Sequence, residues 1–198
     1  MPGRMAALQF VVGIDVGTTS VRAGVFSTAT GARRGLAVQP IETWRPSPSI
    51  VQQSSADIWT AAGAACRAAV AAAVASGVDH TQIVGLGFDA TCSLVVLDKA
   101  GLPLSVSPDG APEQNVVVWC DHRALAEADE ITAGGHSALK YVGGVMSPEM
   151  QPPKLLWLKR HLPASFDEAG KFFDLSDFLI YAATGLDVRS LCSNVCSR

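Results

Sequence analysis

The sequence lacks the features that mark several common functional classes. Its 15 Lys and Arg residues are outnumbered by 18 Asp and Glu residues, which gives a formal net charge of −3. There is therefore no basic excess to bind nucleic acid or an acidic membrane. No segment matches G-x-x-x-x-G-K-[ST], which excludes a P-loop on this chain. The expected partner is a small molecule or another protein.

Cysteine pairs and a leader segment are also missing. The five cysteines are an odd number and have no C-x-x-C spacing. Cys192 and Cys196 lie four residues apart, but without a nearby His they are a weak metal signal, and reduced thiols are expected. Residues 1–9 contain no long apolar run with a cleavage site, which predicts a cytoplasmic protein. The Ala-rich run 61–75 contains Arg67 and is expected to be too weakly apolar to span a membrane.

The composition is that of a globular protein. A chain of 198 residues, with 48% apolar and only 17% charged residues, has room for one large domain or two small ones. Residues 10–14, 21–26 and 35–44 form three successive apolar runs separated by turn residues. Three strands at the start of the chain predict an antiparallel meander within a mixed sheet, rather than a Rossmann beginning.

Helical and strand patterns alternate along the rest of the chain, which indicates an α/β fold. The segment 85–90 matches the dinucleotide fingerprint, but no helix pattern follows it, so the match is treated as a coincidence. Pro46 and Pro48 predict a loop. Strands are predicted at 82–88, 94–98 and 115–120, and helices at 54–76, 124–131, 153–161 and 177–184, the last capped by Ser176, with a further element beginning at 189.

The polar segment 15–20, between the first two strands, is the first candidate site. Gly17 permits a positive φ and has no side chain, so polyphosphate can approach its backbone N–H. Asp15, at the end of the first strand, is placed to hold a hydrated Mg²⁺ through water. Arg22 suits either a phosphate or a structural carboxylate. The alternative is ordinary turn chemistry, because Gly, Asp, Thr and Ser populate turns in many proteins.

Two further positions are candidates for ligand binding. The strand predicted at 115–120 delivers Trp119, Asp121, His122 and Arg123 to its carboxyl end, where ligands bind in α/β sheets. The alternative is that Asp121 caps the next helix, with His122 and Arg123 on the surface. Lys154 follows a helix start, where a cation is unfavourable unless an acceptor offsets it; its alternative is a solvated surface lysine.

Four separated segments, 13–22, 85–93, 119–123 and 177–185, resemble the amino-terminal lobe of the FGGY carbohydrate kinases, members of the actin-like ATPase superfamily. The Trp-x-Asp-His segment and the Asp-Ala-Thr-Cys-Ser strand end are similar to those of ribulokinases. The resemblance implies an α/β, ribonuclease H-like domain with a mixed sheet flanked by helices. It also implies phosphorylation of a ketopentose by MgATP, giving D-ribulose 5-phosphate from D-ribulose.

The resemblance assigns roles to particular residues. Asp15 would order Mg²⁺ through water, and positioning with charge neutralisation would carry phosphoryl transfer. The general base is expected to be an Asp of the carboxyl-terminal lobe. The phosphate group would be bound by Gly17, Thr18, Thr19, Ser20 and Arg22, and the sugar by Asp89, Thr91, Cys92, Trp119, Asp121 and Lys154.

The resemblance also sets the expected domain organisation. Residues 1–8 are expected to form a tail and 9–198 a truncated amino-terminal lobe, without the lobe that carries the adenine pocket. Such a chain is expected to bind sugar weakly and to catalyse little. One alternative is a non-catalytic binding or regulatory module, including a homodimer. Another is a kinase for L-ribulose, xylulose, glycerol or a tetritol.

Overall fold

The structure is a computed structural model that describes residues 8–196, with side chains described up to Ser193. The expected tail thus lies outside the described residues except for Leu8. Within residues 8–196 the chain divides into two compact units. Unit 1 comprises residues up to Ile41 together with Ile58–Asp89, and unit 2 comprises Glu42–Asp57 together with the residues from Ala90 onward.

Unit 1 contains the predicted meander. Its strands run antiparallel from β1 to β2 and from β2 to β3, and the register pairs Asp15 with Arg22 and Gly24 with Leu36. A fourth strand, β6, lies on the other side of β1, so the order is β3-β2-β1-β6. The elements are β1 (Phe10–Val16), β2 (Ser20–Ser27), β3 (Arg33–Pro40), the short 3-10 helix η1 (His80–Gln82) and β6 (Ile83–Ala90).

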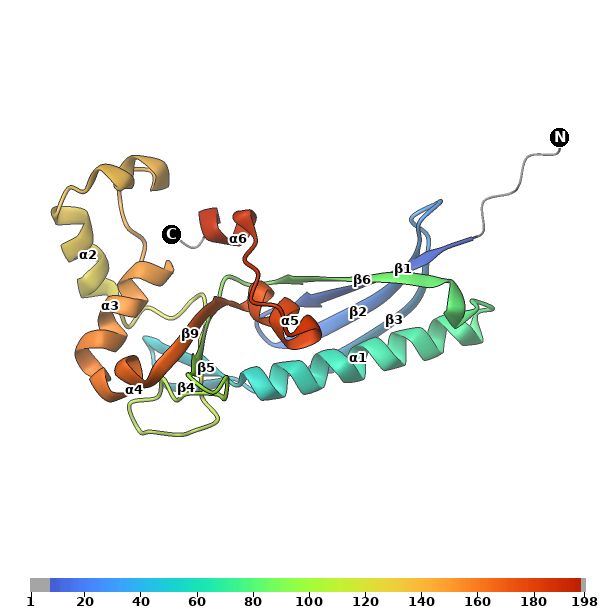
Figure 1. The fold of residues 1–198 in the computed structure, drawn as a ribbon, viewed down its shortest axis with the longest axis horizontal. Coiled ribbons are helices and arrows are strands. Elements are labelled where there is room, and N and C mark those ends of the chain that lie inside the picture. The colour runs from blue at the N-terminus through green and yellow to red at the C-terminus, as the bar shows by residue number, and fades with distance from the viewer. Residues whose placement is uncertain (1–7, 197–198) are drawn as a thin grey trace. The chain divides into compact units, whose positions relative to one another are not determined.

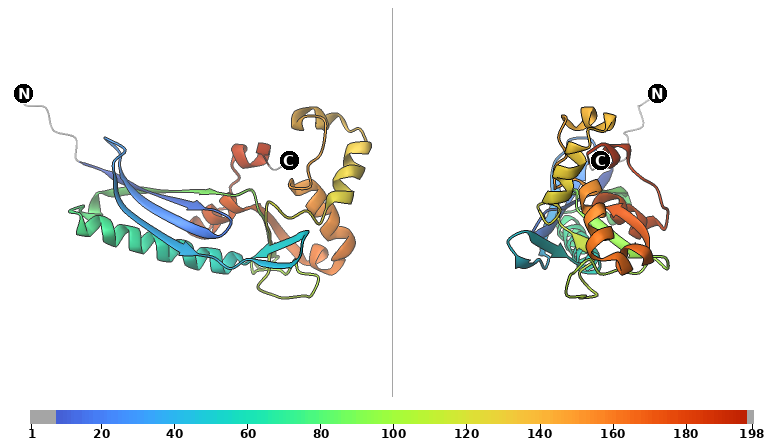
Figure 2. Two further views of the ribbon diagram at one scale, coloured as in Figure 1. Left: turned by 180° about the vertical axis from the view of Figure 1, so that it is seen from behind. Right: turned by 90° about the vertical axis from the view of Figure 1, so that its left-hand side faces the viewer.

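Helix α1 (Ser55–Ala75) covers one face of this sheet, as Figures 1 and 2 show from opposite sides. The helix begins where the sequence indicates, because Ser54 Oγ accepts a hydrogen bond from Asp57 N at 3.3 Å. β3 lies directly against the helix: a Cβ added at Gly35 would lie 2.1 Å from the Ala69 carbonyl oxygen. This close approach needs both the glycine on the strand and the alanines on the helix.

The sequence analysis expected the Ala-rich run 61–75 to be too weakly apolar to span a membrane. Helix α1, which contains this run, is nevertheless long and apolar enough to do so by length and hydropathy alone. In the structure, however, one face of the helix is packed inside unit 1. The alanines on that face recur every three or four residues, as a helix packed on a sheet requires. Ala62, Ala65, Ala69 and Ala73 are each at most 1% exposed. Helix α1 therefore packs one face on the sheet of unit 1 and leaves its other face exposed.

Unit 2 is built on an antiparallel five-stranded sheet in the order β4-β5-β8-β7-β9. Leu94, Val96, Val106, Val117 and Leu158 form a buried apolar cluster within the unit. The strands are β4 (Trp44–Ser47), β5 (Ile50–Gln53), β7 (Leu94–Asp98), β8 (Val116–Val117) and β9 (Ala169–Asp174). The helices are α2 (Leu125–Ala133), the 3-10 helix η2 (Ser137–Val142), α3 (Gln151–His161), α4 (Pro163–Glu168), α5 (Leu175–Thr184) and α6 (Leu191–Cys196).

Several expectations about unit 2 need correction. The β4–β5 hairpin replaces the loop predicted from Pro46 and Pro48, because an edge strand such as β4 tolerates proline. The strand predicted over 115–120 pairs only at Val116–Val117. β9 was not predicted at all, since its run is short and mixed. Helix α5 is capped by Asp174, whose side chain accepts from Ser176 N, so Ser176 is not the cap.

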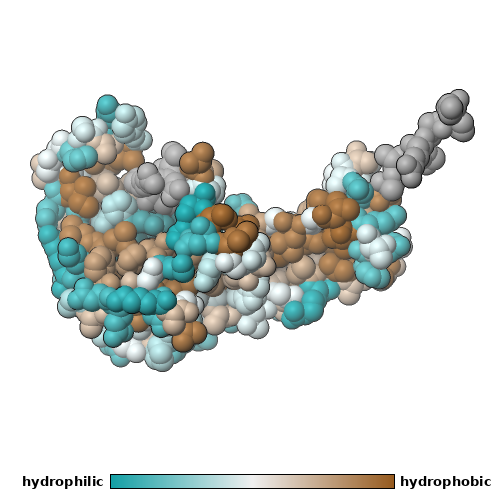
Figure 3. Space-filling view, in the orientation of Figure 1, coloured by the Kyte–Doolittle hydropathy of each residue, from teal (hydrophilic) through white to brown (hydrophobic). Residues whose placement is uncertain are grey.

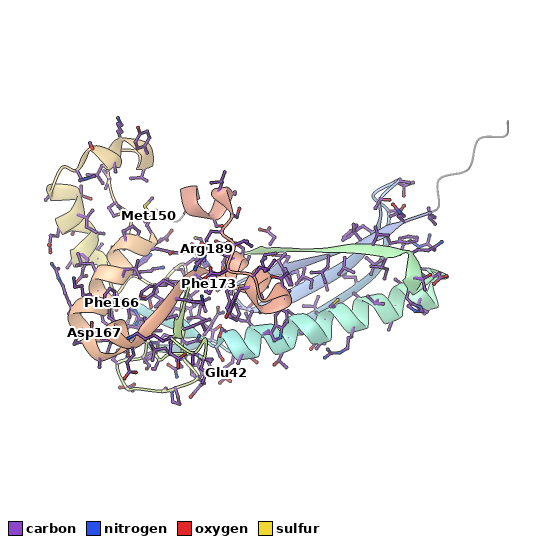
Figure 4. The ribbon with its side chains drawn as sticks, in the orientation of Figure 1. Glu42, Met150, Phe166, Asp167, Phe173 and Arg189 are labelled. Carbon is purple, nitrogen blue, oxygen red and sulfur yellow. The ribbon has the colours of Figure 1, made fainter. Side chains whose placement is uncertain are left out.

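The segment after α5 contacts β9 and α5 within unit 2. The Arg189 guanidinium lies 3.7 Å from the centre of the Phe173 ring on β9, and both residues are labelled in Figure 4. Arg189 Nη1 also donates to the Phe172 carbonyl at 2.6 Å. The buried Asp177 of α5 accepts hydrogen bonds from Ser190 N and from the Ser193 hydroxyl. These contacts place α6 beside α5.

The contact between β3 and α1 gives a test of the fold. We expect Gly35→Ala to lower the free energy of unfolding by about 2 kcal/mol, because the new methyl group meets backbone atoms that cannot rotate away. Gly87→Ala on β6 is the matched control, since its Cβ would meet no atom within 4 Å. Urea unfolding followed by circular dichroism measures both variants. Equal midpoints for Gly35→Ala and the parent chain would contradict the packing.

Candidate functional site

The predicted site residues fall into two groups that belong to different units. The chain passes from one unit to the other between Asp89 and Ala90, so neighbouring residues of a single sequence motif are divided. Each group is described by itself. Unit 1 holds Asp15, Gly17, Thr18, Thr19, Ser20, Arg22 and Asp89, and unit 2 holds Thr91, Cys92, Trp119, Asp121 and Lys154.

The β1–β2 turn presents an ion pair. Asp15 and Arg22 face each other in the register, and Arg22 Nη1 donates to Asp15 Oδ2 at 2.6 Å. Both side chains are about half exposed, at 50% for Asp15 and 49% for Arg22. Of the two partners expected for Arg22, the structure thus contains the carboxylate. The turn itself closes by a hydrogen bond from Gly17 N to the Ser20 carbonyl at 3.0 Å.

Gly17 lies against the side chain of Arg22. Its φ is not positive, and its N–H is donated to Ser20 rather than directed at a ligand. A Cβ at this position would lie 3.2 Å from Arg22 Nη1. The glycine therefore makes room for the guanidinium beside Asp15. Sequence reasoning missed this because the close approach depends on a side chain five residues away.

A cavity of about 400 Å³ lies on the sheet face of unit 1 that carries the Asp15–Arg22 pair. Asp15 and Arg22 line it from β1 and β2, and Asp89 lines it from β6. Gly13 and Gly24 contribute to the same lining, where they leave space beside the Phe26 ring. The fold thus brings together two carboxylates that are 74 residues apart in the sequence.

This pair of carboxylates fits a hydrated Mg²⁺. Mg²⁺ is commonly held by one or two carboxylates while it keeps several waters and binds phosphate oxygens. Asp15 is half exposed and Asp89 is exposed, so both are accessible to a hydrated ion. Among the described residues no group of three or more His, Cys, Asp or Glu side chains converges on one point. A metal here would therefore depend on water and on a phosphate-bearing ligand.

Lys154 dominates the candidate site in unit 2. It lies in the first turn of α3 and is 1% exposed, so it is not a solvated surface residue. Its Nζ donates to the carbonyl oxygens of Val118 at 2.9 Å and Trp119 at 3.0 Å, which are the acceptors expected for a cation at this position. Burial lowers the pKa of Lys154 from 10.5 to about 8, while the nearby Asp121 opposes the shift. An ammonium group has three N–H donors, and two of them are used here.

Asp121 is fully buried and holds the surrounding backbone together. Its carboxylate accepts from Val51 N at 2.7 Å, and from Arg123 Nη2 at 2.7 Å and Nε at 2.9 Å. The Arg123 side chain is only 2% exposed and lies 4.9 Å from the centre of the Trp157 ring. The alternative of an Asp121 cap with Arg123 on the surface is therefore wrong: the N-cap of α2 is Ala124. The sequence analysis did not predict that Arg123 is buried. The only feature of the sequence that indicates a buried Asp–Arg pair is the Asp-x-Arg spacing directly after a strand.

Thr91 and Trp119 are linked by Ser93, which the sequence analysis did not name as a site residue. Ser93 is fully buried; its Oγ lies 3.0 Å from Thr91 Oγ1 and accepts from Trp119 N at 3.1 Å. Burial raises the pKa of the Cys92 thiol, and so does the charge of Asp174, whereas Lys154 lowers it. Thr91, Cys92, Trp119 and Lys154 thus form one wall in unit 2.

Glu149 was also missed as a member of this group. It lies in the loop before α3, and its charge raises the pKa values of both Lys154 and Cys92. Its Oε1 lies 3.3 Å from His122 Nε2. The wall therefore combines a buried cation with a carboxylate at its edge, an arrangement suited to a ligand rich in hydroxyl groups.

The fold of the described residues is one that solved sugar kinases share. The structure is similar to that of a gluconate kinase from Lactobacillus acidophilus, with a TM-score of 0.78, 19% identity, and coverage of 96% of this chain and 36% of that one. It is also similar to a xylulose kinase from Rhodospirillum rubrum, with a TM-score of 0.69, 21% identity, and coverage of 87% of this chain and 33% of that one. These likenesses define the actin-like ATPase fold.

The sequence comparisons define the family. Residues 10–196 match the model of the FGGY family of carbohydrate kinases, N-terminal domain. An FGGY carbohydrate kinase domain-containing protein of Homo sapiens is 52% identical over 98% of this chain and 34% of its own length. A D-ribulokinase of Saccharomyces cerevisiae is 45% identical over 96% of this chain and 26% of its own length. The chain belongs to the FGGY family of carbohydrate kinases and spans about a third or less of the length of these relatives.

The buried lysine makes the stability of the chain depend on pH. Because the folded-state pKa of Lys154 is about 8 and its ordinary value is 10.5, the unfolded state binds more protons between these two values. We therefore expect the contribution of Lys154 to the free energy of unfolding to rise as the pH rises from 8 toward 10.5. Urea unfolding of the parent chain and Lys154→Met at several pH values measures it.

Lys154 also affects the pKa of the Cys92 thiol, so both chains carry Cys92→Ser. The Lys154→Met variant then serves as the reference, because it lacks the titrating ammonium group. The difference in unfolding free energy, parent minus variant, should increase with pH over this interval. A difference that stays constant would contradict a lowered pKa at Lys154.

Proposed function

We propose that this chain is the amino-terminal part of an ATP-dependent kinase that phosphorylates a ketopentose. Within this class we propose D-ribulose as the substrate, with D-ribulose 5-phosphate and ADP as products. In this reaction the primary hydroxyl oxygen of the sugar forms a bond to the γ-phosphorus of ATP, and the bond from that phosphorus to the β,γ-bridging oxygen breaks.

The observation that carries the proposal is the buried ammonium of Lys154. Two of its donors are held by the carbonyls of Val118 and Trp119, so the remaining donor has a defined direction. A buried, oriented cation on a wall with Thr91 and Cys92 suits the carbonyl and hydroxyl oxygens of a ketose. The 45% identity to a D-ribulokinase supports D-ribulose within this class.

Asp121 enters the proposal as a positioning residue rather than a sugar contact. Its oxygens are occupied by Val51 and Arg123, and it is fully buried. Its carboxylate accepts from Val51 N, and the Val51 carbonyl accepts from Val118 N at 3.0 Å, so Asp121 helps to position the backbone at Val118. The Val118 and Trp119 carbonyls in turn hold Lys154. We propose that Thr91, Cys92, Trp119 and Lys154 of unit 2 contact the sugar.

The residues that we propose to bind the metal and the transferred phosphate lie in unit 1. Asp15 would hold Mg²⁺ through water, while Thr18, Thr19 and Ser20 would offer hydroxyl groups to the transferred phosphate. When bound, the metal supplies charge neutralisation for the phosphate groups. Arg22 is paired with Asp15, so it would reach a phosphate only by sharing its guanidinium between the two. The general base is assigned to the part of the relatives that this chain does not match.

Other polyols remain as competing substrates, because glycerol kinases of 32–34% identity also match most of this chain. A cytoplasmic location is part of the proposal. The cysteines with described side chains, Cys66, Cys92, Cys120 and Cys192, are all free thiols, which suits a reducing compartment.

The proposal predicts a ligand-dependent melting temperature. D-ribulose should raise the melting temperature of the chain more than L-ribulose, D-xylulose or glycerol, because binding to the folded state adds about 2.7 kcal/mol at a ligand concentration of 100 times Kd. Lys154→Met should abolish the shift, because it removes the buried donor. Differential scanning fluorimetry measures it.

Lys159→Met is the matched control, since Lys159 lies on the same helix but is exposed. Its shift with D-ribulose should equal that of the parent chain. A larger shift with glycerol would replace the ketopentose with a smaller polyol. An equal shift in Lys154→Met would remove Lys154 from the binding site.

A further inference from the structure

The wall that contains Lys154 has more carboxylates than cations beside it. Lys154 is its cation, and two carboxylates belong to the elements around it: Glu149 in the loop before α3 and Asp174 at the end of β9. A third carboxylate, Asp121, is compensated by the buried Arg123, whose Nη2 donates to it at 2.7 Å. These groups together leave a negative charge uncompensated at the wall.

Asp174 is placed next to the wall by the sheet of unit 2. The register pairs it with Leu94, the first residue of β7, which follows Cys92 by two positions. Gln151, in the first turn of α3, donates from Nε2 to Asp174 Oδ2 at 3.4 Å. Because Asp174 is buried and also accepts from Ser176 N, it acts on a ligand through its charge and not by direct contact.

Glu149 lies at the accessible edge of the wall. It precedes α3, and Lys154 lies in the first turn of that helix. The Glu149 side chain is 40% exposed, so an incoming ligand can approach its carboxylate. His122 Nε2 lies 3.3 Å from Glu149 Oε1, but the imidazole carries no charge unless it is protonated. A neutral His122 therefore leaves the charge of Glu149 in place.

The charges of both carboxylates reach the wall. Burial raises the pKa of the Cys92 thiol, and the charges of Asp174 and Glu149 raise it further, against the effect of Lys154. Burial lowers the pKa of Lys154 to about 8, and the charges of Asp121 and Glu149 oppose this shift. A ligand anion brought to the wall would meet the charges of Asp174 and Glu149 in the same way.

Neutral and anionic sugars interact differently with such a wall. A hydroxyl group can donate to a carboxylate, and a carbonyl or hydroxyl oxygen can accept from the third N–H of Lys154. A ligand carboxylate also accepts from Lys154, but it has no proton to donate to Glu149, and like charges repel it. The fold does not decide between the two, because a gluconate kinase and a xylulose kinase, named for a sugar acid and a neutral sugar, both share it.

We propose that Glu149 and Asp174 make this site selective for uncharged sugars and exclude sugar acids. This selectivity rests on the proposed function, because it takes the wall as the sugar site. Glu149 is the principal determinant, since its carboxylate is accessible to the ligand. Asp174 adds a second negative charge from a buried position.

The ratio of two dissociation constants measures the selectivity. Isothermal titration calorimetry on this chain compares D-ribonate, a sugar acid with the same number of carbon atoms, with D-ribulose. The parent chain should bind D-ribonate more weakly by a factor of about ten or more, because two like charges that lie 4 Å apart repel each other even in water. Glu149→Gln removes one charge and keeps the size of the side chain, so it should reduce the ratio about tenfold.

Glu168→Gln is the matched control for the change in charge. Glu168 is exposed at the end of α4, which follows the other end of α3, so the variant loses the same charge away from Lys154. Figure 3 shows a hydrophilic surface at α4, as expected for side chains that lie in water. The ratio of dissociation constants for Glu168→Gln should equal that of the parent chain.

His122→Lys tests the charge without removing Glu149. A lysine at this position puts a permanent cation beside the Glu149 carboxylate, where the imidazole now lies. The ratio should therefore fall in this variant as well, because the carboxylate is compensated. An unchanged ratio in both Glu149→Gln and His122→Lys would show that charge does not select the ligand.

The binding results also separate this selectivity from the proposed kinase function. A parent chain that binds D-ribulose and D-ribonate equally well would overturn the selectivity and leave the kinase proposal standing. A parent chain that binds D-ribonate but not D-ribulose would overturn both. Binding of neither ligand would also overturn both, because the wall would then not be a sugar site.

Discussion

The buried ion pair between Asp121 and Arg123 is the interaction on which unit 2 depends. The Asp121 carboxylate reaches Val51 N on β5, while Arg123 Nη1 donates to the Val106 carbonyl at 2.8 Å and the guanidinium covers the Trp157 ring on α3. A buried pair of charges is tolerated only when its hydrogen bonds are satisfied, and here each charged group has several partners. The pair therefore ties a strand, a loop and a helix to one point.

The wall of Thr91, Cys92, Trp119 and Lys154 depends on this ion pair. The backbone that precedes Asp121 carries the Val118 and Trp119 carbonyls, and these hold the Lys154 ammonium in an otherwise costly buried position. Lys154 in turn lies close enough to Cys92 to affect the pKa of its thiol. The Lys154 ammonium, the backbone of residues 118–119 and the Cys92 thiol therefore belong to one network of interactions. The Asp121–Arg123 ion pair is part of the same network.

Much of the local structure could be predicted, because it depends on short-range patterns. The three-strand meander follows from apolar runs and turn residues, and the start of α1 follows from its Ser54 cap. The need for an acceptor at Lys154 also followed from its place in a helix start. Predictions failed where a distant group intervened. Gly17 is shaped by Arg22, and Arg123 is buried by its contacts with Val106 and Trp157.

The sequence by itself determined the family, the three-strand meander, most of the helices and most of the residue types that the site uses, because motifs and periodicity are local properties of the chain. The tertiary structure decided which of these residues meet. It brought Asp15 and Asp89 to one cavity and paired Asp121 with the buried Arg123. These outcomes depend on long-range packing and on the partner each polar group finds when water is removed, which no local pattern records.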